Sequence, residues 1–195
     1  AYGVPTLLSG DTLKFVPTNF NADSDASTSI PGPTRVELFK FSRVYTTNGG
    51  EIASISITES GDYQIIGAGF VNVNMRLQSV DNVDDGAATP GFPETTTPQF
   101  NWNTSTPTGG PLVNWSLTGT VTPAALFSDL ASDIDFSIQN TLQAFATSPN
   151  YAFVQKKLSL TITATSTVPV PAAVWLFGSG LGLLGLLRRR TALLA

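Results

Sequence analysis

The sequence predicts an all-β protein: an antiparallel β-sandwich, jelly-roll-like, followed by one C-terminal hydrophobic helix. Three observations support this prediction. Apolar and polar side chains alternate with a period of two in several segments, which is typical of strands with one buried face. Glycine-containing turn motifs separate these segments. The last 28 residues instead contain 20 consecutive residues without a charge, which is the length of a membrane-spanning helix.

Eight segments are predicted strands, and their one-sided polarity favours antiparallel sheets with one solvated face. In the clearest segment, valine, methionine and leucine alternate with asparagine and arginine. In chain order, the predicted strands are residues 13–16, 35–45, 52–58, 63–66, 71–77, 113–121, 134–138 and 158–164. The predicted turns are Asn48-Gly49-Gly50, Ser60-Gly61-Asp62, Gly67-Ala68-Gly69 and Thr108-Gly109-Gly110-Pro111.

The remaining segments are a helix, two loops and the tail. One short helix is predicted at residues 123–131, with Thr122 as its N-cap and Pro123 as its first residue. Residues 21–33 and 81–108 are predicted long loops because they are rich in Ser, Asp, Thr, Pro and Gly. The predicted organisation is a β-sandwich domain, a polar stem and a hydrophobic helix with a basic cluster. These parts cover residues 1–162, 163–167 and 168–195.

The composition excludes several kinds of site. The chain has no cysteine and no histidine, so it lacks disulfides, thiolate ligands and the commonest general base. Residues 1–167 contain 7 basic and 14 acidic residues, hence a formal charge of −7. A body of that sign is poorly suited to nucleic acid or to anionic lipid headgroups. No nucleic-acid partner is therefore expected.

The tail has three parts in a fixed order. It begins with the proline motif Val168-Pro169-Val170-Pro171, continues without charge to Leu187, and then carries the basic cluster Arg188, Arg189 and Arg190. A helix of 20 residues is about 30 Å long, which matches the hydrocarbon core of a bilayer. Arginines directly after such a helix mark the cytoplasmic side. The sequence therefore predicts a membrane-inserted tail with the body on the outer side.

In the order and spacing of these parts, the tail resembles the PEP-CTERM sorting signal. That signal is found on exported proteins of Gram-negative bacteria and is paired with exosortase enzymes. The resemblance is confined to the tail, and Val170 stands where the name-giving motif has Glu. It implies export, an intermediate anchored in the inner membrane, and processing near the proline motif with exosortase as partner. Because sorting follows export, a signal peptide is expected to have been removed before Ala1.

Three glycines form a stripe in the predicted tail helix. Gly178, Gly182 and Gly185 are three and four residues apart, so they share one helix face. Such small-residue stripes let a second helix backbone approach closely. Two interpretations remain open: packing of tails in an assembly, and recognition by the processing machinery.

Calcium is the one cofactor for which the sequence offers a candidate site, because clustered carboxylates supply the oxygen ligands that Ca²⁺ prefers. The candidate ligands are Asp81, Asp84 and Asp85. Val83 interrupts this cluster at a position where a ligand is needed, so a solvated acidic turn is the alternative. A weaker cluster with the same alternative contains Asn21, Asp23 and Asp25.

Two further sets of residues are candidates for carbohydrate chemistry. Flat aromatic rings stack on sugar faces, and the alternative is that they fasten a loop onto the core; the set is Phe92, Phe100, Trp102 and Trp115. Paired carboxylates can hydrolyse a glycoside, and Asp133 and Asp135 alternate onto one strand face. Nothing in the sequence brings two carboxylates to one cleft, so no enzymatic activity is expected.

Together these features predict a non-enzymatic, exported structural protein of the cell surface or extracellular matrix. We expect it to assemble with copies of itself as a filament, tube or biofilm scaffold, and to be sorted or anchored by its C-terminal helix. The alternative is a glycan- or calcium-dependent carbohydrate-binding module on the cell surface.

Overall fold

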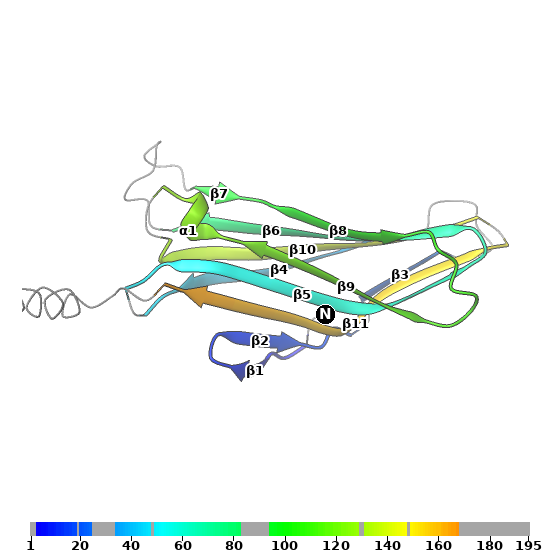
Figure 1. The fold of residues 1–195 in the computed structure, drawn as a ribbon, viewed down its shortest axis with the longest axis horizontal. Coiled ribbons are helices and arrows are strands. Elements are labelled where there is room, and N and C mark those ends of the chain that lie inside the picture. Colours follow the sequence, from blue (N-terminus) through cyan, green and yellow to red (C-terminus); the bar gives the residue numbers. More distant parts are fainter. Residues whose placement is uncertain are drawn as a thin grey trace, which may run out of the picture.

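The computed structural model describes residues 3–18, 20–24, 34–47, 49–82, 94–128, 131–147 and 149–167. Within these residues it confirms the all-β prediction, because two antiparallel sheets lie against each other as two layers (Figure 1). Sheet A has the order β1-β2-β11-β5-β9, and β3 also pairs with β11. Its strands are β1 (Thr6–Ser9), β2 (Thr12–Phe15), β3 (Phe20–Ser24), β5 (Ile52–Ile66), β9 (Val113–Val121) and β11 (Tyr151–Ser166).

Sheet B has the order β4-β10-β6-β7, and β8 also pairs with β6. Its strands are β4 (Thr34–Tyr45), β6 (Gly69–Asp81), β7 (Thr95–Thr96), β8 (Gln99–Thr104) and β10 (Asp133–Ala146). The period-two patterns of the sequence create the core between the sheets. Along β10, buried side chains alternate with half-buried ones over the whole strand, and Ile134, Phe136 and Ile138 face sheet A.

The predicted turn at Ser60-Gly61-Asp62 is wrong, because β5 continues through it without a break. A Cβ atom on Gly61 would lie 1.9 Å from the backbone oxygen of Gln155 and 2.9 Å from Nε1 of Trp115. Gly61 therefore provides room for a neighbouring strand and an indole ring. The predicted turn at Gly67-Ala68-Gly69 is confirmed between β5 and β6, where Gly67 has a φ of 76°.

Both long-loop predictions are wrong in part. Residues 20–24 form β3, which pairs with β11, and residues 99–104 form β8, which pairs with β6 over its full length. In β3, Phe20 and Ala22 are buried between exposed polar residues, so the strand period is present although the composition resembles a loop. Residues 25–33 and 83–93 lie outside the described residues.

The predicted helix is much shorter than expected. Helix α1 covers Pro123–Leu126, with Pro123 at its start as predicted, but Thr122 makes no side-chain cap hydrogen bond. Phe127 has extended backbone angles and a side chain only 8% exposed. Because Phe127 enters the core, the chain leaves the helix after one turn. Of the predicted helix, residues 129 and 130 lie outside the described residues.

Strand β11 extends beyond the predicted domain boundary at residue 162. Thr163, Ala164 and Thr165 pair with β5, and the backbone N–H of Thr167 donates to the carbonyl oxygen of Glu51. Most of the predicted stem is therefore part of sheet A. The predicted C-terminal helix lies outside the described residues, and among the residues that are described no helix is long and apolar enough to cross a membrane.

Candidate functional site

The two sheets have outer faces of different chemistry. The outer positions of β5, β9 and the second half of β11 carry hydroxyl side chains, which we name the hydroxyl face. Its members are Ser54, Ser56, Thr58, Ser60, Ser116, Thr118, Thr120, Ser159, Thr161, Thr163 and Thr165. The outer positions of sheet B carry many amide side chains, which we name the amide face. Its members are Asn72, Asn74, Gln78, Gln99, Asn101, Asn103, Gln139 and Gln143.

Cross-strand hydrogen bonds order the hydroxyl face. Thr58 pairs with Thr118 across β5 and β9 at 3.0 Å, and Ser60 pairs with Ser159 across β5 and β11 at 3.1 Å. Each such pair contributes about 0.2–1 kcal/mol in a sheet. No member of the hydroxyl face is charged. This face is therefore an uncharged, regularly spaced surface.

The amide face is also linked across strands. Nδ2 of Asn74 donates to Oδ1 of Asn101 at 2.5 Å, and Nδ2 of Asn72 donates to Oε1 of Gln143 at 3.1 Å. A shallow pocket of about 420 Å³ lies on this face, next to Phe70. Its amide lining comes from Asn72, Asn101 and Asn103.

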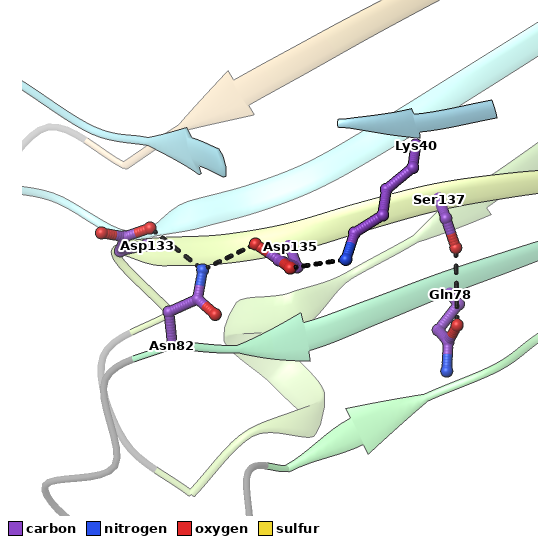
Figure 2. Close-up of polar contacts among 6 residues, drawn as sticks. All are labelled: Lys40, Gln78, Asn82, Asp133, Asp135 and Ser137. Carbon is purple, nitrogen blue, oxygen red and sulfur yellow. Dashed lines mark hydrogen bonds and ion pairs between the residues drawn. The ribbon is translucent and has the colours of Figure 1, made fainter. Parts of the chain in front are cut away.

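A charged cluster occupies one end of sheet B (Figure 2). Nδ2 of Asn82 lies between two carboxylates, donating to Asp133 at 3.3 Å and to Asp135 at 3.1 Å. Nζ of Lys40 reaches Asp135 at 3.0 Å, and the guanidinium of Arg43 reaches Asp133 at 2.6 Å. The period of two places both aspartates on the outer face of β10, as the sequence predicts.

The neighbours of these aspartates stabilise their ionised forms. The hydrogen bond from Arg43 is the main cause that lowers the pKa of Asp133, and the one from Asn82 adds to it. The pKa of Asp135 is lowered by hydrogen bonds from Asn82 and Lys40. A glycosidase instead needs one carboxyl group with a raised pKa to act as the acid, and neither Asp133 nor Asp135 has a raised pKa.

Acid should therefore weaken this end of the sheet. Both carboxylates have a lower pKa in the folded protein than in the unfolded chain, so their stabilisation is present above about pH 4. It should be lost as the pH falls through their folded-state pKa values. At pH 7 we expect a higher melting temperature for wild type than for Asp133→Asn, and the difference should shrink as the pH falls below about 4. A constant gap from pH 7 to pH 2 would contradict this assignment.

The calcium candidate is only partly described. Asp81 is 3% exposed and pairs with the inward residue Ile134, so its side chain lies on the face of β6 opposite to that of Asn82. Asp84 and Asp85 lie outside the described residues. Among the residues that are described, no three acidic side chains are grouped as a metal site. Calcium binding stays a prediction.

The weaker acidic cluster is also only partly described. Asn21 and Asp23 are exposed on β3, and Asp25 lies outside the described residues. The tail residues also lie outside the described part of the chain. They are the proline motif 168–171, the glycine stripe Gly178, Gly182 and Gly185, and the basic cluster 188–190.

The described aromatic candidates point into the protein. Trp102 stacks on Trp115 with ring centroids 5.8 Å apart and meets Tyr63 edge-on at 5.2 Å. Phe100 is packed against the core. These three rings therefore fasten β8 and β9 to the interior, which is the alternative that the sequence left open. Phe92 lies outside the described residues.

A buried ion pair is the main feature that the sequence analysis missed. Nζ of Lys156 on β11 lies 2.5 Å from Oε1 of Glu59 on β5, and both side chains are 0% exposed. Glu59 follows Ile55 and Ile57 at the inward positions of β5. Continuing the period of two past Ile57 would have placed Glu59 inside, but the incorrect turn at Gly61 hid that pattern.

The two long edge strands differ in how well they are protected against pairing with a strand of another chain. β4 carries Arg35, Glu37, Lys40 and Arg43, and its pairing with β10 contains a register shift between Ile134 and Phe136. Charges and bulges of this kind discourage pairing with another chain. β9 is nine residues long, pairs only with β5 among the described strands, and carries no charge or proline. Within the described part of the chain, no further strand therefore pairs with the β9 edge.

The fold and these surfaces together define a two-layer antiparallel β-protein with one protected long edge and one that no other described strand covers. A comparison of this chain with protein-family models and with curated protein sequences finds no match.

Proposed function

We propose that this chain is a non-enzymatic structural protein of the cell surface or extracellular matrix that assembles with copies of itself through β9. The observation that carries the proposal is the long, uncharged edge of β9. An edge strand presents unpaired N–H and C=O groups to any chain that can align with it. Main-chain hydrogen bonds then give affinity, as in other cases of strand addition.

The strand order supports the finer fold assignment, a jelly roll. In that arrangement, one sheet has the order β3-β11-β5-β9 and the other β4-β10-β6-β8, so β9 and β8 are the edge strands at one side of the sandwich. The charge-free sequences of these two strands make this side the one that faces a second copy.

Two contacts are needed for a polymer. A β9–β9 contact uses the same surface on both copies, so it closes after two copies. Growth into a filament or tube then needs a second contact. In copies that keep the C-terminal helix, we assign this contact to its stripe of Gly178, Gly182 and Gly185.

Export and anchoring are supported by the tail. The order of proline motif, 20 uncharged residues and Arg188–Arg190 supports exosortase-dependent sorting, with an intermediate held in the inner membrane by the helix. In that form, residues 1–167 should be digested by protease added to the periplasmic side, while the arginine cluster is protected.

Charge added to the β9 edge should weaken assembly. The variant Thr118→Lys/Thr120→Lys places two like charges from each copy beside the contact. Each facing like-charge pair costs up to about 1 kcal/mol, so association should weaken about tenfold or more. Size-exclusion chromatography with light scattering measures the change.

The matched control is Thr161→Lys. Thr161 lies in the same hydroxyl row as Thr118 but on the interior strand β11, with Thr58 between them. Association should be unchanged in this variant if the edge is the contact. Equal loss in both variants would assign the contact to the whole hydroxyl face, and a monomeric wild type would refute the proposal.

A second candidate function is carbohydrate binding. The pocket on the amide face favours it, because Asn and Gln amides offer a donor and an acceptor side by side to neighbouring sugar hydroxyls. Retention of the protein on insoluble polysaccharide, with and without calcium, tests this function. Asn101→Ala should reduce the retention, since Asn101 lines the pocket.

A further inference from the structure

The interior of the sandwich contains the amine of a buried lysine. Lys156 and Glu59 face inward from neighbouring strands of sheet A, with Nζ and Oε1 2.5 Å apart. The ring of Phe20 on β3 lies 5.3 Å from the same nitrogen. Burial lowers the pKa of Lys156, while the carboxylates of Glu59 and Glu37 oppose that shift. Burial therefore makes the neutral amine of Lys156 easier to reach than that of a lysine in water.

An amide side chain lies in the same layer. Asn140 is 0% exposed and faces inward from β10 in sheet B. Its cross-strand partner on β4 is Glu37, whose charge acts on Lys156. The consecutive strands β10 and β11 also lie one over the other in the two layers. Asn140 and Lys156 thus extend from opposite sheets into one closed interior.

We propose that Lys156 and Asn140 form an intramolecular amide bond across the two sheets, with Glu59 carrying the proton. Nζ of Lys156, after giving one proton to Glu59, attacks Cγ of Asn140. The adduct passes a second proton from Nζ to Glu59 and breaks its bond to Nδ2, which takes up both protons through Glu59 and leaves as ammonium. One C–N bond forms and one breaks, no electrons are transferred, and the carboxylate of Glu59 is restored.

Such a bond has a clear physical effect in this chain. Without cysteine the chain cannot form a disulfide, and the amide would fix β11 of sheet A to β10 of sheet B. The attack is intramolecular between groups held by rigid strands, which greatly raises their effective concentration. Because water is excluded, hydrolysis of the product is disfavoured.

Intact-mass spectrometry of the denatured full-length chain tests the proposal directly. The expected mass is lower than that of the sequence by one ammonia, and peptide mapping should recover one branched peptide that joins residues 140 and 156. A mass equal to that of the sequence would overturn the proposal, and so would a branched peptide at any other pair.

Three variants identify the chemistry. Lys156→Arg keeps the charge beside Glu59 but has no amine to acylate, so it should retain its full mass. Asn140→Asp should lose water in place of ammonia and so reach the same final mass as wild type. Glu59→Gln should slow the loss of ammonia at least tenfold after refolding.

The control is Asn101→Ala, on the outer face, which should lose ammonia as wild type does. Loss of ammonia from Lys156→Arg would overturn the assignment.

Discussion

Replacing Glu59 by leucine is expected to lower the free energy of unfolding by about 3–5 kcal/mol. The substitution leaves the ammonium of Lys156 in the core without the carboxylate that lies 2.5 Å from it. A single buried charge is far more costly than a buried pair, because desolvation of the remaining charge is no longer offset by attraction. Urea unfolding followed by circular dichroism measures the change.

The second substitution separates charge from packing. In Glu59→Leu/Lys156→Met two apolar side chains of similar volume occupy the same space, so a large part of the loss should be recovered. Neither variant can form the Lys156 amide by the proposed route, so their difference reports the buried charge.

The exposed pair Lys40–Asp135 is the control, since its side chains are 58% and 26% exposed. Lys40→Met should cost less than about 1 kcal/mol. A similar cost for Lys40→Met and Glu59→Leu would mean that burial does not govern the effect.

Trp115→Ala is expected to be equally destabilising, by about 3–5 kcal/mol, which is usual when a large buried aromatic side chain is removed. The ring is 3% exposed, stacks on Trp102, and donates from Nε1 to the carbonyl oxygen of Gln155 at 3.1 Å. Its loss opens a cavity beside Gly61, where the close approach of β11 leaves no side chain to fill it.

Two comparisons test the cause of this effect. Trp115→Phe keeps much of the ring but removes the donor to Gln155, so it should cost clearly less than the alanine variant. Trp102→Ala should also cost less, because Trp102 is only partly buried. Chemical unfolding of the three variants at one protein concentration gives the ranking. If Trp102→Ala proved the most costly, β8 and not β9 would be the main aromatic support of the core.

Local alternation along the chain was sufficient to predict most of the strands. The predicted strand at residues 113–121 matches β9, and residues 35–45 and 71–77 lie within β4 and β6. A period of two reflects which side chains of a single strand are buried, so it is visible without knowledge of any neighbour. For the same reason the sequence placed Asp133 and Asp135 on one face of their strand.

Composition was a weaker guide where a residue had a role in packing. Gly61 resembled part of a turn, yet its missing side chain makes room for Trp115 and the backbone of Gln155. Residues 20–24 and 99–104 resembled loops because of their Asn, Asp and Thr content, yet pairing with β11 and β6 makes them strands. The helix after Thr122 ended early because Phe127 is drawn into the core.

The sequence by itself determined the all-β class and the inward and outward face of most strands. Every prediction about the tail also rests on the sequence alone. Only the tertiary structure decided which strands are neighbours, and hence that Lys156 meets Glu59, that Asn82 bridges two aspartates, and that β9 is an edge among the described strands. The physical reason is that alternation is a property of one strand, whereas partners are chosen by packing between segments far apart in the chain. Composition and period carry no information about that choice.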